Sequence, residues 1–206
     1  MALVKSSRQN MLTTAETPVR DLAALLDDLS AAEPSVRRAA ARDLAAHPEA
    51  AMPACDRLEI EASPSVRAVL LTTLIHLQSP AVAVRLAAHL RSEDVPLRNA
   101  AIEALQEMPD AIAPHLQDLL ADEDSDVRIF AVNILGALRH AQAPEWLAEV
   151  VRSDPHINVC AAAVDALAEI GSLETLIDLE NLRRRYDGNA FMEFAIDAAM
   201  RRIEGQ

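Results

Sequence analysis

Residues 126–136 read Asp-Val-Arg-Ile-Phe-Ala-Val-Asn-Ile-Leu-Gly, and their apolar positions have the spacing of an amphipathic helix. The same pattern, Val-Arg followed by apolar residues and then Leu, returns about every thirty residues. Its copies begin at Val36, Val66, Leu97, Val127 and Val159, with a degenerate copy at Phe191. A fixed period of this length is typical of a solenoid, in which each unit buries its apolar face against the next.

Each copy is preceded by another segment with helical periodicity, so one unit contains two helices. Short breaks with capping and turn residues, such as Ser63-Pro64 and Gly171-Ser172, separate the helices and favour antiparallel pairs. The sequence therefore predicts an all-α fold, an α-solenoid of about six helix pairs. We expect residues 17–206 to form a single repeat domain and residues 1–16, which lack periodicity, to form a flexible N-terminal tail.

Two of the copies resemble a known family. Residues 126–136 and residues 158–171 are similar to the second helix of a HEAT repeat, of the bacterial kind also found in phycobilin lyases. Cys160 departs from the pattern, since the family usually has arginine at this position. The resemblance covers roughly residues 18–203, and it implies a right-handed superhelix whose second helices line a concave face.

The chain is acidic, with 19 Lys and Arg against 32 Asp and Glu and a formal net charge of −13. Between Glu93 and Asp126 the only basic residue is Arg98, so the acidic surplus is concentrated there. A polyanion would meet an adverse field, which argues against nucleic acid and anionic membrane surfaces as partners. HEAT-like DNA glycosylases use a basic groove with aromatic residues, whereas this chain has one Trp and one Tyr.

The sequence also indicates a cytoplasmic protein. It begins without the apolar segment of a signal peptide, and no run reaches the roughly 18 apolar residues of a membrane span. Cys55 and Cys160 lie on units three repeats apart, too distant for a disulfide, so we expect two reduced thiols.

No motif indicates catalysis. The six histidines form no His-Glu pair, whereas HEAT-like hydroxylases that hold iron use such pairs. The four glycines are scattered, which excludes a phosphate-binding glycine loop. We therefore expect no enzymatic activity, no metal site and no cofactor.

Four arginines occupy one position in successive second helices and are expected to stack as a ladder: Arg37, Arg67, Arg98 and Arg128. They could form an anion-binding strip, or each could bridge loop carboxylates such as Asp94, Asp124 or Asp126. We favour the structural interpretation, because the position recurs regardless of its surroundings.

The residues two and six positions after each repeat apolar residue should project from the second helices. They change from unit to unit, as a binding surface would and as unconstrained surface residues also would. We expect a partner site at the centre of the concave face, formed by Thr72, Asn99, Glu103, Ile129, Asn133 and Asp165. Ile129 is the sizeable apolar anchor of this set.

Two further segments suggest interfaces. Trp146, the only tryptophan, falls at a position that is partly exposed on the convex side, where its ring could also lie over a neighbouring helix. In the last helix, Met192, Ile196 and Ile203 would leave apolar surface at the end of the array unless that helix is buried on two sides. Such a surface favours weak homodimers through the C-terminal end.

The sequence thus favours a non-catalytic protein–protein interaction scaffold or adaptor that binds a protein partner on its concave face. The alternative, implied by the family resemblance, is an accessory subunit of a lyase or of a chromophore-handling enzyme.

Overall fold

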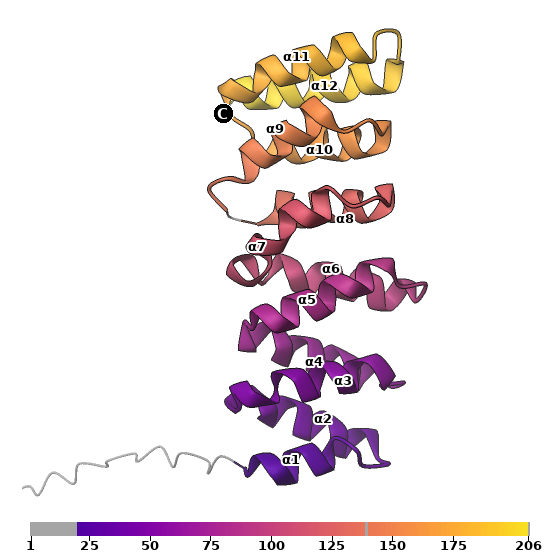
Figure 1. Cartoon of the computed structure of the whole chain (residues 1–206), viewed down its shortest axis with the longest axis vertical. Coiled ribbons are helices and arrows are strands. Elements are labelled where there is room, and N and C mark those ends of the chain that lie inside the picture. The colour runs from indigo at the N-terminus through magenta and orange to yellow at the C-terminus, as the bar shows by residue number, and fades with distance from the viewer. Residues whose placement is uncertain (1–19, 139, 206) are drawn as a thin grey trace, which may run out of the picture.

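The computed structural model describes residues 20–138 and 140–205. The expected tail, residues 1–16, lies outside the described residues. Within them the chain forms helices and turns without any strand (Figure 1). The helices are α1 (Leu22–Asp28), α2 (Pro34–Asp43), α3 (Ala51–Ile60), α4 (Pro64–Leu77), α5 (Pro80–Ala88), α6 (Val95–Gln106), α7 (Pro109–Leu120), α8 (Ser125–Ala137), α9 (Ala143–Ser153), α10 (Ile157–Ile170), α11 (Leu176–Arg185) and α12 (Ala190–Glu204).

Consecutive helices pair, and the pairs stack in chain order from one end of the molecule to the other (Figure 1). The odd-numbered helices form one layer, here called the first-helix layer, and the even-numbered helices form the second-helix layer. Contacts within the second-helix layer are extensive between α2 and α4, α8 and α10, and α10 and α12. The predicted all-α solenoid of helix pairs is therefore confirmed. None of the described helices is long and apolar enough to cross a membrane.

Every second helix begins in the same way. Its N-cap residue lies three positions before the apolar residue that opens the repeat pattern, and the caps are Glu33, Ser63, Asp94, Asp124, His156 and Asn189. The Asp94 and Asn189 side chains accept hydrogen bonds from backbone N–H groups three residues later, at 3.1 and 3.0 Å. Such caps satisfy backbone donors that the first helical turn leaves free.

This regularity corrects the register of the last unit. Asn189 lies three residues before Met192, so Met192 and not Phe191 opens the sixth copy of the pattern. Met192 is fully buried, as are Val66, Val127 and Val159 at the same position. Val36, in the first unit that the structure describes, is 37% exposed.

The expectation that Met192, Ile196 and Ile203 leave apolar surface is wrong, because these side chains are 0%, 0% and 3% exposed. They form the face that packs on α10. The one-residue change of register turns two aromatic residues outward instead, Phe191 at 64% and Phe194 at 69% exposure.

The last helix pair also carries polar groups on its surface. Arg183 of α11 forms an ion pair with Glu180 at 3.1 Å and another with Asp197 of α12. Each of these side chains is at least a third exposed. The surface of this helix pair therefore carries both ion-paired groups and exposed apolar side chains, since Leu173 and Ile177 are also 67% and 61% exposed.

Replacing Met192 by Glu should unfold or loosen the last unit rather than change self-association. The substitution removes a buried apolar side chain and buries an unpaired carboxylate, at a cost of roughly 3–5 kcal/mol. A thermal melt, with light scattering at two protein concentrations, measures both properties. Phe194→Glu, at a 69% exposed position, is the matched control and should melt close to the unmodified protein. A Met192→Glu protein of unchanged melting temperature would contradict the assignment of Met192 to the core.

Candidate functional site

The arginine ladder joins each unit to the next through their loops. The Arg37 guanidinium donates to the Ala31 and Ala32 carbonyl oxygens of its own unit at 2.9 and 2.7 Å. It also donates to both carboxylate oxygens of Glu61 in the following unit, at 2.8 and 2.7 Å. Arg67 and Arg128 repeat this arrangement with Asp94 and Asp154. These guanidinium groups are occupied by internal partners, which supports the structural interpretation of the ladder.

Glu61 is a fully buried carboxylate held by several donors. Arg57 also donates to it, at 2.7 Å, and so does the Ser63 backbone N–H, at 2.8 Å. The hydrogen bonds from Arg37, followed by those from Ser63 and Arg57, lower the pKa of Glu61 from 4.5 to about 2. The charge is thus offset where it is buried.

Arg98 departs from the expected bridging of loop carboxylates. Its Nη1 donates to the Ser92 carbonyl at 2.8 Å, and its guanidinium lies 5.4 Å from the centroid of the Phe130 ring. Its buried Nε has no hydrogen-bond partner among the described residues. Asp124 does not pair with a ladder arginine, because its carboxylate caps α8 by accepting from the Asp126 N–H at 2.8 Å. Of the proposed carboxylates, Asp94 alone forms an ion pair with the ladder in the structure described.

The last two units replace the ladder arginine in different ways. The Cys160 thiol donates to the Asp154 carbonyl at 3.3 Å, so it contacts the loop that an arginine would bind. Arg185 of α11 supplies the missing guanidinium, donating to the Val151 and Arg152 carbonyls at 3.0 Å each and to the Cys160 sulfur at 2.9 Å. In the sixth unit Glu193 occupies the ladder position, so an acceptor replaces the guanidinium donor, and its carboxylate accepts a hydrogen bond from the Gly188 N–H at 3.0 Å.

A groove of about 610 Å³ lies on the second-helix layer between α8 and α10. Its lining residues include five glycine and alanine residues as well as larger side chains. Three of the residues predicted from sequence to bind a partner line it together: Ile129, Asn133 and Asp165. Ile129 is half-buried, whereas Asn133 and Asp165 are exposed. The groove thus combines an apolar anchor, an amide and a carboxylate.

The other three predicted residues lie outside this groove, on α4 and α6. Asn99 and Glu103 are exposed on α6, and the Thr72 hydroxyl donates to the Ala68 carbonyl of its own helix at 3.0 Å. The larger lining residues that the prediction missed are Asn158, Glu169 and Phe191. Asn158 and Phe191 each precede the repeat apolar residue of their unit, a position that the prediction did not consider; for Phe191 this is evident only in the corrected register.

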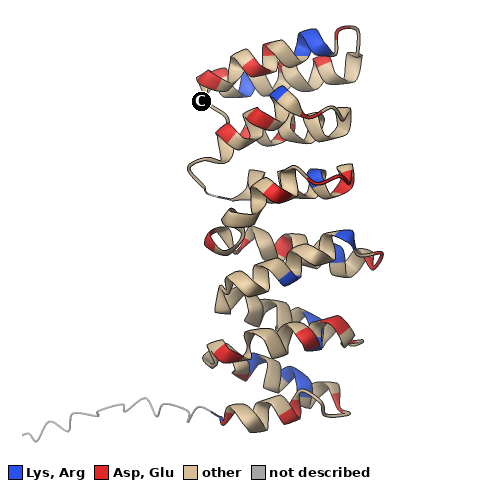
Figure 2. Ribbon diagram, viewed as in Figure 1, with Lys and Arg blue, Asp and Glu red and all other residues tan. Residues whose placement is uncertain are grey.

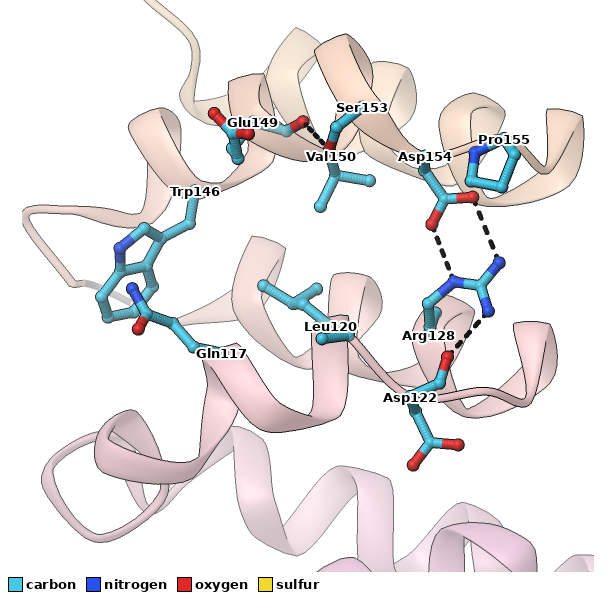
Figure 3. Close-up of a pocket in the computed structure, with 11 residues that line it drawn as sticks. Gln117, Leu120, Asp122, Arg128, Trp146, Glu149, Val150, Ser153, Asp154 and Pro155 are labelled. Carbon is cyan, nitrogen blue, oxygen red and sulfur yellow. Dashed lines mark hydrogen bonds and ion pairs between the residues drawn. The ribbon is translucent and has the colours of Figure 1, made fainter.

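A second cavity, of about 480 Å³, opens between the same two units in the first-helix layer. Figure 3 shows Leu120 and Val150 facing each other across it, with Trp146 and Gln117 at one end and the Arg128–Asp154 ion pair at the other. Trp146 is half-buried and stacks on His140 with ring centroids 4.9 Å apart. We call this cavity the crevice. A role for Trp146 as an interface residue stays a prediction.

The crevice exists because α7 and α9 make little direct contact, although α5 packs on α7 and α9 packs on α11. On the opposite layer α8 and α10 approach closely at Gly136, where an added Cβ atom would lie 2.8 Å from the Ala166 Cβ. The two units are therefore close on the second-helix side and open on the first-helix side.

The charged residues also recur from unit to unit. Figure 2 shows basic residues recurring from unit to unit beside acidic ones, toward the side where the loops within pairs lie. Arg202, the cation bound to Glu169 at 2.6 Å, lies outside the residues that line the groove.

In the part of the chain that the structure describes, no group of three or more His, Cys, Asp or Glu is placed to hold a metal ion.

Residues 112–189 match a family model described as HEAT repeats. The match begins in α7 and ends at the turn before α12, so it includes the crevice and all of the groove except Phe191. This part of the chain therefore consists of HEAT-like repeats. A comparison of the protein's sequence with curated proteins finds no match.

Solved structures similar to the HEAT-like array include human deoxyhypusine hydroxylase in complex with glycerol, at 21% identity over 88% of this chain and 73% of that chain, with a TM-score of 0.48. They also include the complex of CpcE and CpcF of phycocyanin lyase from Nostoc sp. PCC7120. That match has 16% identity over 98% of this chain and 100% of that chain, with a TM-score of 0.38.

Acid should weaken the array through Glu61. Its pKa is lowered on folding, so its contribution is fully present above pH 4.5 and is lost as the pH falls toward 2. At about 1.4 kcal/mol per pKa unit, the contribution is on the order of 3 kcal/mol. Urea unfolding at pH 5, 4 and 3 should show a pH dependence that Glu61→Gln reduces and that Glu204→Gln, at an exposed carboxylate, leaves unchanged. Equal pH dependence in all three proteins would contradict this assignment.

Arg128→Ala should cost more stability than Arg98→Ala. Removing Arg128 leaves the buried Asp154 carboxylate without its two guanidinium bonds, at a cost of about 3 kcal/mol. Removing Arg98 loses one bond to a carbonyl and a cation–π contact, for about 1–2 kcal/mol. Urea midpoints at neutral pH compare the two variants directly. A larger loss for Arg98→Ala would show that the carboxylate bridge is not the main contribution of the ladder.

Proposed function

We propose that this HEAT-like array is a non-catalytic scaffold that binds a protein partner on its second-helix layer. The observation that carries the proposal is the groove between α8 and α10, where Ile129, Asn133 and Asp165 meet. Its lining combines apolar side chains with amides and carboxylates, and a desolvated apolar anchor ringed by hydrogen-bonding groups is how interfaces concentrate binding energy.

The state of the two thiols supports a non-catalytic role. Cys55 and Cys160 are both buried and free. Burial raises the pKa of Cys55 to about 11 and also raises the pKa of Cys160. A nucleophilic cysteine requires a lowered pKa and access to its substrate, so neither thiol is suited to that chemistry.

The acidic character of the chain defines the class of partner. Of the groove residues, Asp165 and Glu169 are acidic and none is basic. A polyanion would be repelled, whereas a protein surface with matching positive charge would be attracted.

Ile129→Arg should abolish partner capture while leaving thermal stability nearly unchanged. The substitution replaces the apolar anchor by a charged side chain, and loss of a central anchor reduces affinity by roughly a hundredfold. Affinity capture from the native cell with mass spectrometry should recover the same proteins with the unmodified chain and with Ala68→Arg. This control makes a similar change at the same repeat position of the second unit, where Ala68 is exposed.

Intact capture by Ile129→Arg would move the site elsewhere, first to Trp146 and the crevice. The alternative function, an accessory subunit of a lyase or chromophore-handling enzyme, has a different signature. It requires a coloured or small-molecule ligand after purification, or a catalytic subunit among the captured proteins.

A further inference from the structure

Asp165 is the carboxylate of the groove that the protein itself leaves uncompensated. It projects from α10 beside small residues, and it forms no hydrogen bond or ion pair with the described residues. Glu169, one helical turn later, is bound by Arg202 at 2.6 Å. Asp165 is exposed, but the side chains around it displace part of its water, and this desolvation raises the pKa of its carboxyl group.

The groove lets another chain approach this carboxylate closely. Five of its lining residues have side chains no larger than a methyl group, namely Gly136, Ala137, Ala161, Ala162 and Ala166.

The other residues that line the groove are larger. They include Ile129 of α8 and Phe191, which lies at the start of α12 and is 64% exposed. Asn133 and Asn158 line the same groove as Asp165, and their side-chain amides can bond the backbone of an incoming segment.

A partner that covered the groove with apolar groups alone would bury Asp165 without a counter-charge. Burying an unpaired carboxylate is strongly unfavourable, and the groove lining contains no cation to offset it. A bound segment must therefore bring its own cation. A guanidinium matches a carboxylate best, because its planar donors bond both oxygens.

We propose that the groove recognises a partner segment that presents an arginine or lysine side chain to Asp165 and an apolar side chain to Ile129 and Phe191. The inference rests on the proposed function and defines the chemistry of the partner at the same site. Charge complementarity supports it, since the groove is acidic within a chain of net charge −13.

A random peptide display library tests the inference without knowledge of the natural partner. Selection on the unmodified protein should enrich peptides that carry a basic residue at a fixed spacing from an apolar one. The best peptide, made synthetically, should bind Asp165→Asn roughly ten- to a hundredfold more weakly, as expected for a lost charge-assisted pair. Replacing its arginine by neutral citrulline should cause the same loss, and combining both changes should add little further loss.

Glu103→Gln is the matched control. Glu103 occupies the same repeat position as Asp165, on α6, and is exposed outside the groove. It should bind the peptide as the unmodified protein does. Asp165→Asn should melt at the unmodified temperature, because Asp165 has no described partner to lose.

The outcomes separate this inference from the proposed function. The inference would be overturned if the selected peptides lack a basic residue or bind Asp165→Asn as well as the unmodified protein. If those peptides fail to bind Ile129→Arg, the groove still stands as the partner site. Peptides whose binding survives Ile129→Arg, or failure to enrich any peptide, would overturn both.

Discussion

The contact between α8 and α10 determines the surface on both sides of the array at this junction. Gly136 allows the contact, since a side chain there would collide with Ala166. At this junction the pairs come close in the second-helix layer, whereas α7 and α9 make little contact in the first-helix layer, where the crevice opens. Arg128 lines the crevice while the next residue, Ile129, lines the groove, so a change in the helix spacing alters both cavities together.

The ladder holds the loops in register while this spacing varies. Its long side chains bond carbonyl oxygens of one loop and a carboxylate of the next, so they fix the position of each unit relative to its neighbour. Most of the positive charge of these arginines is paired with carboxylates and carbonyl oxygens inside the array. Because the buried guanidinium groups are paired inside the array, the acidic surplus of the chain remains on its surface, where it would act on the proposed partner.

The period of the sequence was sufficient to predict helix pairs and the projecting positions Ile129, Asn133 and Asp165, because both follow from helical geometry alone. The last unit was misread by one residue, since Phe191 and Met192 are both apolar and periodicity does not distinguish them. The cap at Asn189 was the signal that fixes the register. The partners of the ladder could not be predicted, because they depend on which loop lies opposite each guanidinium in the folded array.

Glu61 and Asp165 are two carboxylates with opposite environments in this protein, and the difference supports the proposed binding site. Glu61 receives guanidinium and backbone donors, which lower its pKa and make its charge part of the fold. Asp165 loses water without receiving such donors from the described residues, and its pKa rises. No contact among the described residues offsets the free energy that this desolvation costs. In the proposed complex the cation of the partner offsets it, because it supplies the ion pair that Glu61 receives from within the array.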